Sequence, residues 1–333
     1  MHVPPEVVKG LLRSTERKLI KHPDLTLTYN QEIRKLVDSG YVVKLTPEEI
    51  HSSTESWYVP HHMVHHNNKA RVVFNCSFEF QGTILNNYLL PGPPLGPTLL
   101  GVLLRFRQYP VAVSRDIKAM FRQIRLLPED CHLLWFLWRD CEIERLPDVY
   151  EWRVLPFGTT CSPCCATFAL QRHVKEHQDT HEDIYESVHT AFYVDNCLQS
   201  LSDPQEAKLL IDRMRELLLQ GGFEIRQWAS NLPEVVTHLP STARSESCEL
   251  WLNFKSLDPQ ESTLGLSWHC PTDVLGYKHR PVSYTTVTLR NIYKVLASQY
   301  DPLGYICPYT TRAKLIVQAL WNTERGWDEP IEG

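Results

Sequence analysis

In two stretches of this sequence, an aspartate lies at the end of an apolar run. "PVAVSRD" ends on Asp116, and "AFYVDN" ends on Asp195 and Asn196. Asp and Asn are poor strand formers that favour tight turns, so residues 191–194 predict a buried strand and Asp195 the tip of a β-hairpin, with Cys197 in the return strand. On one sheet, the two acids could hold two divalent cations roughly 3.5–4 Å apart, the arrangement that serves phosphoryl transfer.

Two other groupings suggest zinc or redox chemistry. His173, Glu176 and His177 match the H-x-x-E-H pattern of inverzincin metalloproteases, but their neighbours are typical of a solvated helix face. Cys161–Cys164 form a C-x-x-C, yet a zinc site needs a second pair at similar spacing, and the sequence has none. We therefore interpret the first group as helix surface and the second as buried thiols at a helix start.

Two further motifs have simple structural interpretations. Asp38 begins the Asp-Ser-Gly triplet of aspartic proteases, but here Gly40 follows an amphipathic helix, where a glycine commonly ends the helix. The histidines of "HHMVHH" (61–66) could bind metal, but alternation along a strand distributes them over two faces. We expect a surface or template-facing strand there.

Composition narrows the class of protein. A chain of 333 residues predicts two or three subdomains, and an apolar fraction of 43% with 9 Trp indicates a packed globular protein. The net charge of −5 gives no global basic signature, which leaves a local basic groove open. No secretory segment or membrane-spanning apolar run is visible, so we expect no membrane partner and interpret the 10 Cys as reduced thiols. The sequence leaves localisation open.

Helices and strands alternate in a pattern typical of an α+β protein, which can bring Asp116 and Asp195 onto one sheet. Thr46 and Pro47 are expected to cap and begin a helix. The Pro-rich segment 89–100 predicts a subdomain boundary. Helices are expected in the basic first 30 residues and over 30–40, 98–108, 162–178, 203–222 and 290–321. Strands are expected over 41–45, 110–116, 132–140, 150–156, 223–230 and 262–268. A hairpin is expected over 57–77, with Asn67-Asn68-Lys69 at its tip.

Six blocks occur in the order of reverse transcriptase motifs and resemble most closely the BEL/Pao class of long-terminal-repeat retrotransposons. They are "RVVFNCS", "LNNYLLPGPPLGPTLLGVLLRFRQYPVAVSRDIKAMF", "VLPFGTTCSP", "FYVDNCLQS", "FEIRQWASN" and "STLGLSW". The resemblance covers roughly residues 25–333. It implies a right-hand polymerase fold with an antiparallel palm sheet, and RNA- and DNA-directed DNA synthesis in the integration pathway of a transposable element. It also implies these parts: a basic helical segment at 1–24, fingers at 25–91 and 124–161, a palm at 92–123 and 162–268, and a thumb or start of the connection at 269–333.

The resemblance also implies the roles of the two acids. Asp116 resembles the first palm aspartate, and Asp195 the aspartate of the Tyr-x-Asp box formed with Tyr193 and Val194. Both would be catalytic metal ligands, and the backbone carbonyl of Ile117 would be a further contact. The implied ions are Mg²⁺, with Mn²⁺ as an alternative, and the implied substrates are dNTPs and an RNA or DNA template with its primer. No small organic cofactor is expected.

Five residues resemble the nucleotide-binding positions of the family. Phe121 falls at the aromatic gate under the sugar, where a ring crowds a 2′-hydroxyl and favours dNTPs. Arg71 falls where the incoming triphosphate binds, and Lys69 is a second, looser candidate. Phe157 and Gly158 belong to the loop that lines the nucleotide pocket.

Two amides depart from the family pattern. Asn75 replaces an Asp in the fingers block, and Asn196 replaces the second Asp of the Tyr-x-Asp-Asp box. By strand alternation, we expect Asn196 to point to the other face from Asp195 and to be a less direct metal neighbour. An impaired or domesticated nucleic-acid-binding module therefore stays open as the alternative function.

The sequence shows no protease, RNase H acid set or integrase, and we interpret it as a polymerase module. A dimer or a longer polyprotein context stays open.

Overall fold

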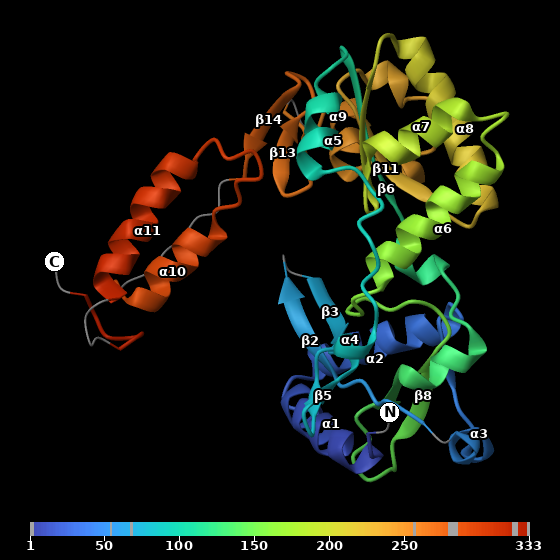
Figure 1. The fold of residues 1–333 in the computed structure, drawn as a ribbon, viewed down its shortest axis with the longest axis vertical. Helices are drawn as coiled ribbons and strands as arrows, with labels where there is room; N and C mark the ends of the chain where they lie inside the picture. Colours follow the sequence, from blue (N-terminus) through green and yellow to red (C-terminus); the bar gives the residue numbers. More distant parts are fainter. Residues whose placement is uncertain are drawn as a thin grey trace. The chain divides into compact units, whose positions relative to one another are not determined.

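The computed structural model describes residues 3–53, 55–66, 69–255, 258–278, 286–321 and 326–331. The chain divides into two compact units (Figure 1). The first unit comprises Met1–Leu95, Lys118–His177 and Gln220–Phe223; the second comprises Gly96–Ile117, Gln178–Leu219 and Glu224–Gly333. The division at Leu95 falls inside the Pro-rich segment, as predicted. The assignment of fingers, palm and thumb stays a prediction.

The first unit packs helices and short antiparallel sheets around an aromatic core. Trp57, Trp138 and Trp152 are almost fully buried there. The buried carboxylate of Glu16 binds the guanidinium of Arg139 through two hydrogen bonds of 2.8 and 2.6 Å, which satisfies both charges. The elements are helices α1 (Pro5–Leu19), α2 (Pro23–Asp38), α3 (Pro47–Ser52), α4 (Leu85–Tyr88) and α6 (Ser162–Glu176), the short 3₁₀ helices η1 (Met120–Gln123) and η2 (Pro128–Leu133), and strands β1 (Val42–Lys44), β2 (His61–His66), β3 (Lys69–Phe74), β4 (Glu79–Phe80), β5 (Thr83–Ile84), β7 (Trp135–Trp138) and β8 (Asp148–Trp152).

Strands of the first unit pair as β1-β8-β7, β2-β3 and β4-β5. The predicted cap is confirmed: the Thr46 side chain accepts the amide of Glu49, and the Glu49 carboxylate accepts the amide of Thr46. The predicted tip residues Asn67 and Asn68 lie outside the described residues.

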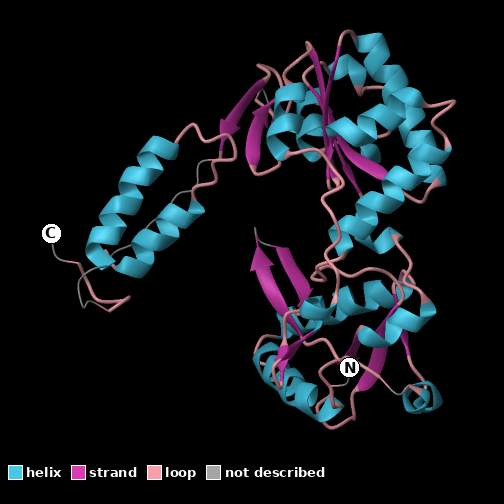
Figure 2. Ribbon diagram, in the orientation of Figure 1, coloured by secondary structure: helices cyan, strands magenta, loops and turns pink. Residues whose placement is uncertain are grey.

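The second unit contains a four-stranded antiparallel sheet, ordered β11-β6-β10-β9, and a three-stranded sheet, β12-β13-β14 (Figure 2). Its helices are α5 (Leu99–Phe106), α7 (Glu182–Ala191), α8 (Pro204–Gln220), α9 (Glu246–Leu252), α10 (Leu289–Ser298), α11 (Cys307–Trp321), η3 (Pro233–Val235) and η4 (Ser241–Ala243); its strands are β6 (Val111–Ile117), β9 (Phe192–Tyr193), β10 (Asn196–Leu201), β11 (Ile225–Ser230), β12 (Gln260–Thr263), β13 (Leu266–His269) and β14 (Val274–Tyr277).

Two predicted strands are wrong in extent. Ala191 ends helix α7, so the strand before Asp195 contains only Phe192 and Tyr193. Residues 262–268 are not one strand, because Leu264 and Gly265 have φ angles of 47° and 81° and form the turn between β12 and β13. A local apolar pattern cannot reveal a two-residue turn when neither residue belongs to a strong turn pair such as Asn-Gly.

All ten cysteines are free thiols. Among the described residues, no helix is long and apolar enough to cross a membrane.

Candidate active site

The four-stranded sheet of the second unit brings the two strand-end acids together. Strand β6 ends with Asp116 and Ile117, and it lies between β10 and β11. The register places Asp116 directly opposite Asn196 on β10 and opposite Arg226 on β11. Asp195 immediately precedes β10, and its carbonyl accepts the backbone amide of Ile117 at 2.9 Å. This hydrogen bond ties the hairpin turn to the end of β6.

The turn that carries Asp195 has only two residues. Tyr193 pairs with Asn196, so Val194 and Asp195 form the loop, and Val194 has a φ angle of 58°. A positive φ at the first loop position matches the primed turns that fit the twist of hairpin strands. For a β-branched valine this region is strained, at a cost of about 1–3 kcal/mol. Asp195 therefore follows directly after a residue with a strained backbone conformation.

The two carboxylates are electrostatically coupled. Burial and, next, the neighbouring Asp195 carboxylate raise the pKa of Asp116 to about 7. The Asp116 Oδ1 atom is buried and has no hydrogen-bond partner among the described residues. Burial also raises the pKa of Asp195, while hydrogen bonds from its own backbone amide and from Asn196 oppose that rise. Two crowded acids with an unsatisfied buried oxygen are a costly arrangement unless a cation neutralises them.

The predicted orientation of Asn196 is wrong. Residues directly opposite each other in an antiparallel pair share a face, so Asn196 lies on the same face as Asp116. Its Nδ2 atom donates a hydrogen bond of 2.9 Å to Asp195 Oδ1. The alternation rule failed because Asp195 belongs to the turn, where side chains do not alternate. Asn196 is thus a direct neighbour of both acids.

These residues fit a divalent cation. Carboxylate oxygens are the ligands that Mg²⁺ prefers, and the unsatisfied Oδ1 of Asp116 offers a lone pair that no protein donor uses. Within the described part of the chain, no three His, Cys, Asp or Glu side chains gather closely enough to hold a metal without further ligands. A cation at this hairpin would therefore take its remaining ligands from backbone, water or substrate.

A buried arginine lies beside Asp116, and the sequence analysis did not identify it. Arg115 is 1% exposed, and alternation along β6 puts its side chain on the opposite face from Asp116. Its guanidinium donates to Ser187 Oγ and Gln199 Oε1, at 3.1 and 2.9 Å, and lies over the rings of Phe192 and Trp228. Its position inside an otherwise apolar strand was the available signal. The contacts make it part of the packing under the hairpin.

The nucleotide-binding candidates all belong to the first unit. The rings of Phe121 and Phe157 are 4.7 Å apart; Phe121 is half-buried and Phe157 is 51% exposed. Gly158 has a φ angle of 110°, and a Cβ there would lie 2.8 Å from the carbonyl oxygen of Phe74, which requires glycine. Arg71 is exposed on β3. Lys69 begins β3, but its side chain lies outside the described residues.

The rival motifs have ordinary structural roles. The rings of His173 on α6 and His177 at its C-cap lie 4.9 Å apart in a tilted arrangement, and Glu176 forms an ion pair with Arg172 at 2.8 Å. Cys161 precedes α6 as its N-cap, but the prediction of buried thiols is wrong, because Cys161 and Cys164 are only partly buried and Cys165 is exposed at the solvent-facing start of the helix. His61 is buried and bonded to Tyr29, whereas His62 is exposed, which confirms the predicted alternation for this pair. The side chains of His65 and His66 lie outside the described residues.

The helix ending at Asp38 is confirmed, with Gly40 in the left-handed region at a φ of 70°.

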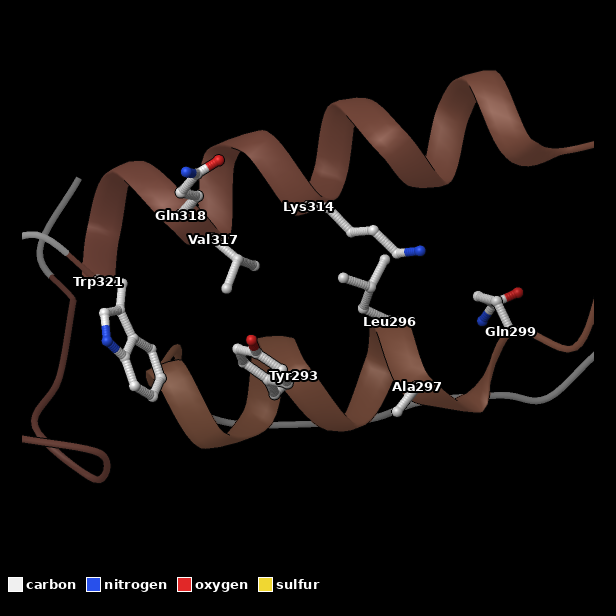
Figure 3. Close-up of a pocket in the computed structure, with 8 residues that line it drawn as sticks. All are labelled: Tyr293, Leu296, Ala297, Gln299, Lys314, Val317, Gln318 and Trp321. Carbon is white, nitrogen blue, oxygen red and sulfur yellow. The ribbon is translucent and has the colours of Figure 1, made fainter.

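A pocket of about 690 Å³ lies between α10 and α11 (Figure 3). Tyr293 and Trp321 lie between the two helices, and Lys314 extends from α11 toward Leu296 on α10. Its eight described lining residues include no carboxylate, so it is separate in chemistry from the paired acids.

Comparisons with known proteins agree with this geometry. Residues 66–228 match the reverse transcriptase (RNA-dependent DNA polymerase) family, and residues 288–333 match the Pao retrotransposon-like RNaseH-like domain. This chain therefore carries a reverse transcriptase domain, and the resemblance to BEL/Pao reverse transcriptases is confirmed. The second match covers part of the segment predicted as thumb or connection; that assignment stays a prediction.

Solved structures show the same fold. One is the foamy viral protease–reverse transcriptase dRH in complex with double-stranded DNA, with a TM-score of 0.58 and 16% identity, over 90% of this chain and 44% of that one. Another is the foamy viral protease–reverse transcriptase in complex with an RNA/DNA hybrid, with a TM-score of 0.55 and 15% identity, over 90% and 37%. The chain thus spans less than half of either protein. The predicted α+β polymerase fold is confirmed. No curated protein matches this chain.

Proposed function

We propose that this chain catalyses template-directed DNA synthesis, in which the 3′-hydroxyl of a primer attacks the α-phosphate of a paired dNTP and pyrophosphate leaves. The observation that carries the proposal is the coupled pair Asp116 and Asp195, with its unsatisfied buried oxygen, at a strained hairpin within a reverse transcriptase domain. The two foamy viral structures, in complex with double-stranded DNA and with an RNA/DNA hybrid, support an RNA or DNA template with its primer as the partner.

Asp116 and Asp195 would hold Mg²⁺, with Mn²⁺ as an alternative, and the Ile117 carbonyl is a further candidate ligand. When bound, the ions would activate the primer hydroxyl and neutralise charge on the departing pyrophosphate. The protein itself would then keep both carboxylates ionised and oriented toward the metal ions. The Asn196 amide and the backbone bond between Ile117 and Asp195 support that aim.

Five residues outside the paired acids would supply the contacts to the nucleotide. Arg71, with Lys69 as a second candidate, would bind the triphosphate as a positively charged partner. Phe121, braced by Phe157, would crowd a 2′-hydroxyl and so select dNTPs, while Gly158 lets the loop backbone approach closely. Base pairing would read the template sequence, and protein contacts to the nucleic acid backbone would be largely sequence-independent and salt-sensitive.

Primer extension on an oligo(dT)-primed RNA template tests this function, first with Mg²⁺ and then with Mn²⁺. Asp116→Ala and Asp195→Ala should each abolish extension, while primer–template binding in EDTA stays within a few-fold of wild type. Asp179→Ala, which removes an exposed carboxylate between α6 and α7, is the matched control and should extend normally. Extension at the wild-type rate by either active-site variant would exclude the two-metal assignment.

The second candidate function is a nucleic-acid-binding module with impaired catalysis. Asn196 favours it, because an amide stands beside both acids where the resemblance implies a third carboxylate. A wild-type protein that is inert at every metal concentration and an active Asn196→Asp variant would establish this alternative.

A further inference from the structure

The end of α1 and the turn to α2 carry positive charge that the protein does not neutralise. Arg13, Arg17, Lys18 and Lys21 are all exposed. None of the four has an ion-pair partner among the described residues, whereas Lys9, earlier on the same helix, pairs with Glu6 at 2.6 Å. Residues 13–22 hold these four cations and a single carboxylate, Glu16. We call Arg13, Arg17, Lys18 and Lys21 the basic face.

The carboxylate of Glu16 does not offset this charge, because it is buried and bound to Arg139. Arg13 and Arg17 are four residues apart on α1, a spacing at which like charges on a helix repel each other, and Lys21 follows in the turn after the helix. In a chain of net charge −5, this concentration of unpaired cations is a local departure from the rest of the molecule.

The basic face borders a pocket of about 310 Å³ in the first unit. Lys18 and Lys21 line the pocket together with His22 from the turn and His62 from β2, whose elements are labelled in Figure 1. The Thr15 hydroxyl also lines it and donates to the His61 carbonyl at 3.5 Å. Leu19, Leu25 and Met63 complete the lining, so the pocket has an apolar floor and four nitrogen-bearing side chains. Those four side chains suit an anionic group with several acceptor oxygens, such as a phosphodiester.

A membrane is a poor fit for this helix. A helix that lies in a lipid interface needs a free apolar face beside its cations. On α1 the apolar residues Val8, Leu12 and Leu19 are at most 5% exposed, because they belong to the core of the first unit. Leu11 and Ile20 are 40% and 45% exposed, so the apolar surface beside the cations consists of two half-exposed side chains, which is small for insertion into lipid.

We propose that the basic face and its pocket bind the phosphate backbone of the nucleic acid on which the reverse transcriptase domain acts. The proposal rests on the proposed function, since a polynucleotide is the polyanion that such a domain must hold. The segment precedes residues 66–228, which match the reverse transcriptase family, so the face extends the nucleic-acid contact beyond that domain. The contacts are to phosphates and carry no sequence preference.

The test compares two variants of equal charge in the full chain. Arg17→Gln/Lys18→Gln/Lys21→Gln removes three cations of the basic face. Lys9→Gln/Arg34→Gln/Lys35→Gln removes three cations that are already paired with Glu6, Asp140 and Glu32. Binding of a fluorescent primer–template with a long single-stranded template overhang is measured by anisotropy in EDTA, without dNTP, from 50 to 300 mM NaCl.

Removing three phosphate contacts should reduce the steepness of the slope of log affinity against log salt concentration by about 2 to 3. It should also weaken binding at least about tenfold at 100 mM salt. The control should keep the wild-type slope. Both variants should unfold within about 2 °C of wild type, because none of the substituted side chains is buried. Equal slopes for the two variants would overturn the proposal. A second outcome would also overturn it: the basic-face variant binds nucleic acid as wild type does, but loses a binding to vesicles of phosphatidylcholine and phosphatidylserine that wild type shows.

The two proposals fail separately. A wild-type protein that extends primers while both triple variants bind nucleic acid alike would overturn the basic face and leave the polymerase function standing. A wild-type protein that never extends a primer, but binds nucleic acid through the basic face, would overturn the polymerase function alone.

Discussion

Replacing Asp116 by Asn should stabilise the metal-free protein while abolishing catalysis. Burial and the Asp195 carboxylate raise the pKa of Asp116 from 3.8 to about 7. Between these two values the native state holds a proton that the unfolded chain has released, so the free energy of unfolding falls as the pH rises. A shift of this size corresponds to about 4 kcal/mol, and solvent screening of this partly exposed group reduces it to about 2 kcal/mol.

The assay is urea unfolding in EDTA at pH 4, 6 and 8. From pH 4 to pH 8, wild type should lose about 2 kcal/mol of unfolding free energy relative to Asp116→Asn, which has no proton to release at this position. Adding 10 mM MgCl₂ at pH 8 should narrow the difference, because a ligand that binds only the native state stabilises it. Asp179→Asn, the exposed control, should follow wild type throughout.

The reasoning is refuted if Asp116→Asn is less stable than wild type at pH 8 in EDTA. It is also refuted if the difference between the two proteins is the same at pH 4 and pH 8. The first result would mean that the carboxylate makes favourable contacts in the absence of metal, and the second that folding does not raise the pKa of Asp116.

Four further predictions follow from the site. Phe121→Val should raise the ratio of rNTP to dNTP incorporation at least about tenfold in single-nucleotide extension; an unchanged ratio would assign the ring to packing alone. Asn196→Asp should lower the Mg²⁺ concentration for half-maximal extension several-fold, with a smaller change in maximal rate. Asn196→Ala is the control, because it also loses the hydrogen bond to Asp195 but adds no charge, and it should not lower that Mg²⁺ concentration. Val194→Gly should raise the free energy of unfolding or leave it unchanged, because relief of the strain at the positive φ offsets the greater chain entropy of the unfolded state. The same variant should reduce primer extension because the turn becomes looser. A large loss of stability would show that Val194 is not strained. Purified protein should contain no stoichiometric zinc by mass spectrometry, and His177→Ala should keep extension within a few-fold; one tightly bound zinc lost in that variant would restore the H-x-x-E-H interpretation.

Much of the local structure could be predicted because its causes are local. The capping pair Thr46 and Glu49, the strand before Asp116 and the helix from Ser162 follow from side-chain periodicity and end signals that lie within a few residues. Helix α7 was missed although its apolar residues Ile184, Val188 and Ala191 lie at helical spacing, because the helix runs directly into the two-residue strand β9 and its last residue was assigned to that strand. Its stability comes from packing on the sheet, which local propensity does not report.

By itself, the sequence determined the identity of the two acids, their position after apolar strands and the order of blocks that resembles a reverse transcriptase. Only the tertiary structure decided which side chains surround those acids. Register across β6, β10 and β11 is a non-local property, because hydrogen bonds between distant segments set which residues lie opposite one another. For that reason Asn196 was expected on the wrong face, although it lies opposite Asp116. The same pairing crowds Asp195 against Asp116 and so raises the Asp116 pKa, an effect of burial and proximity that no spacing in the sequence specifies.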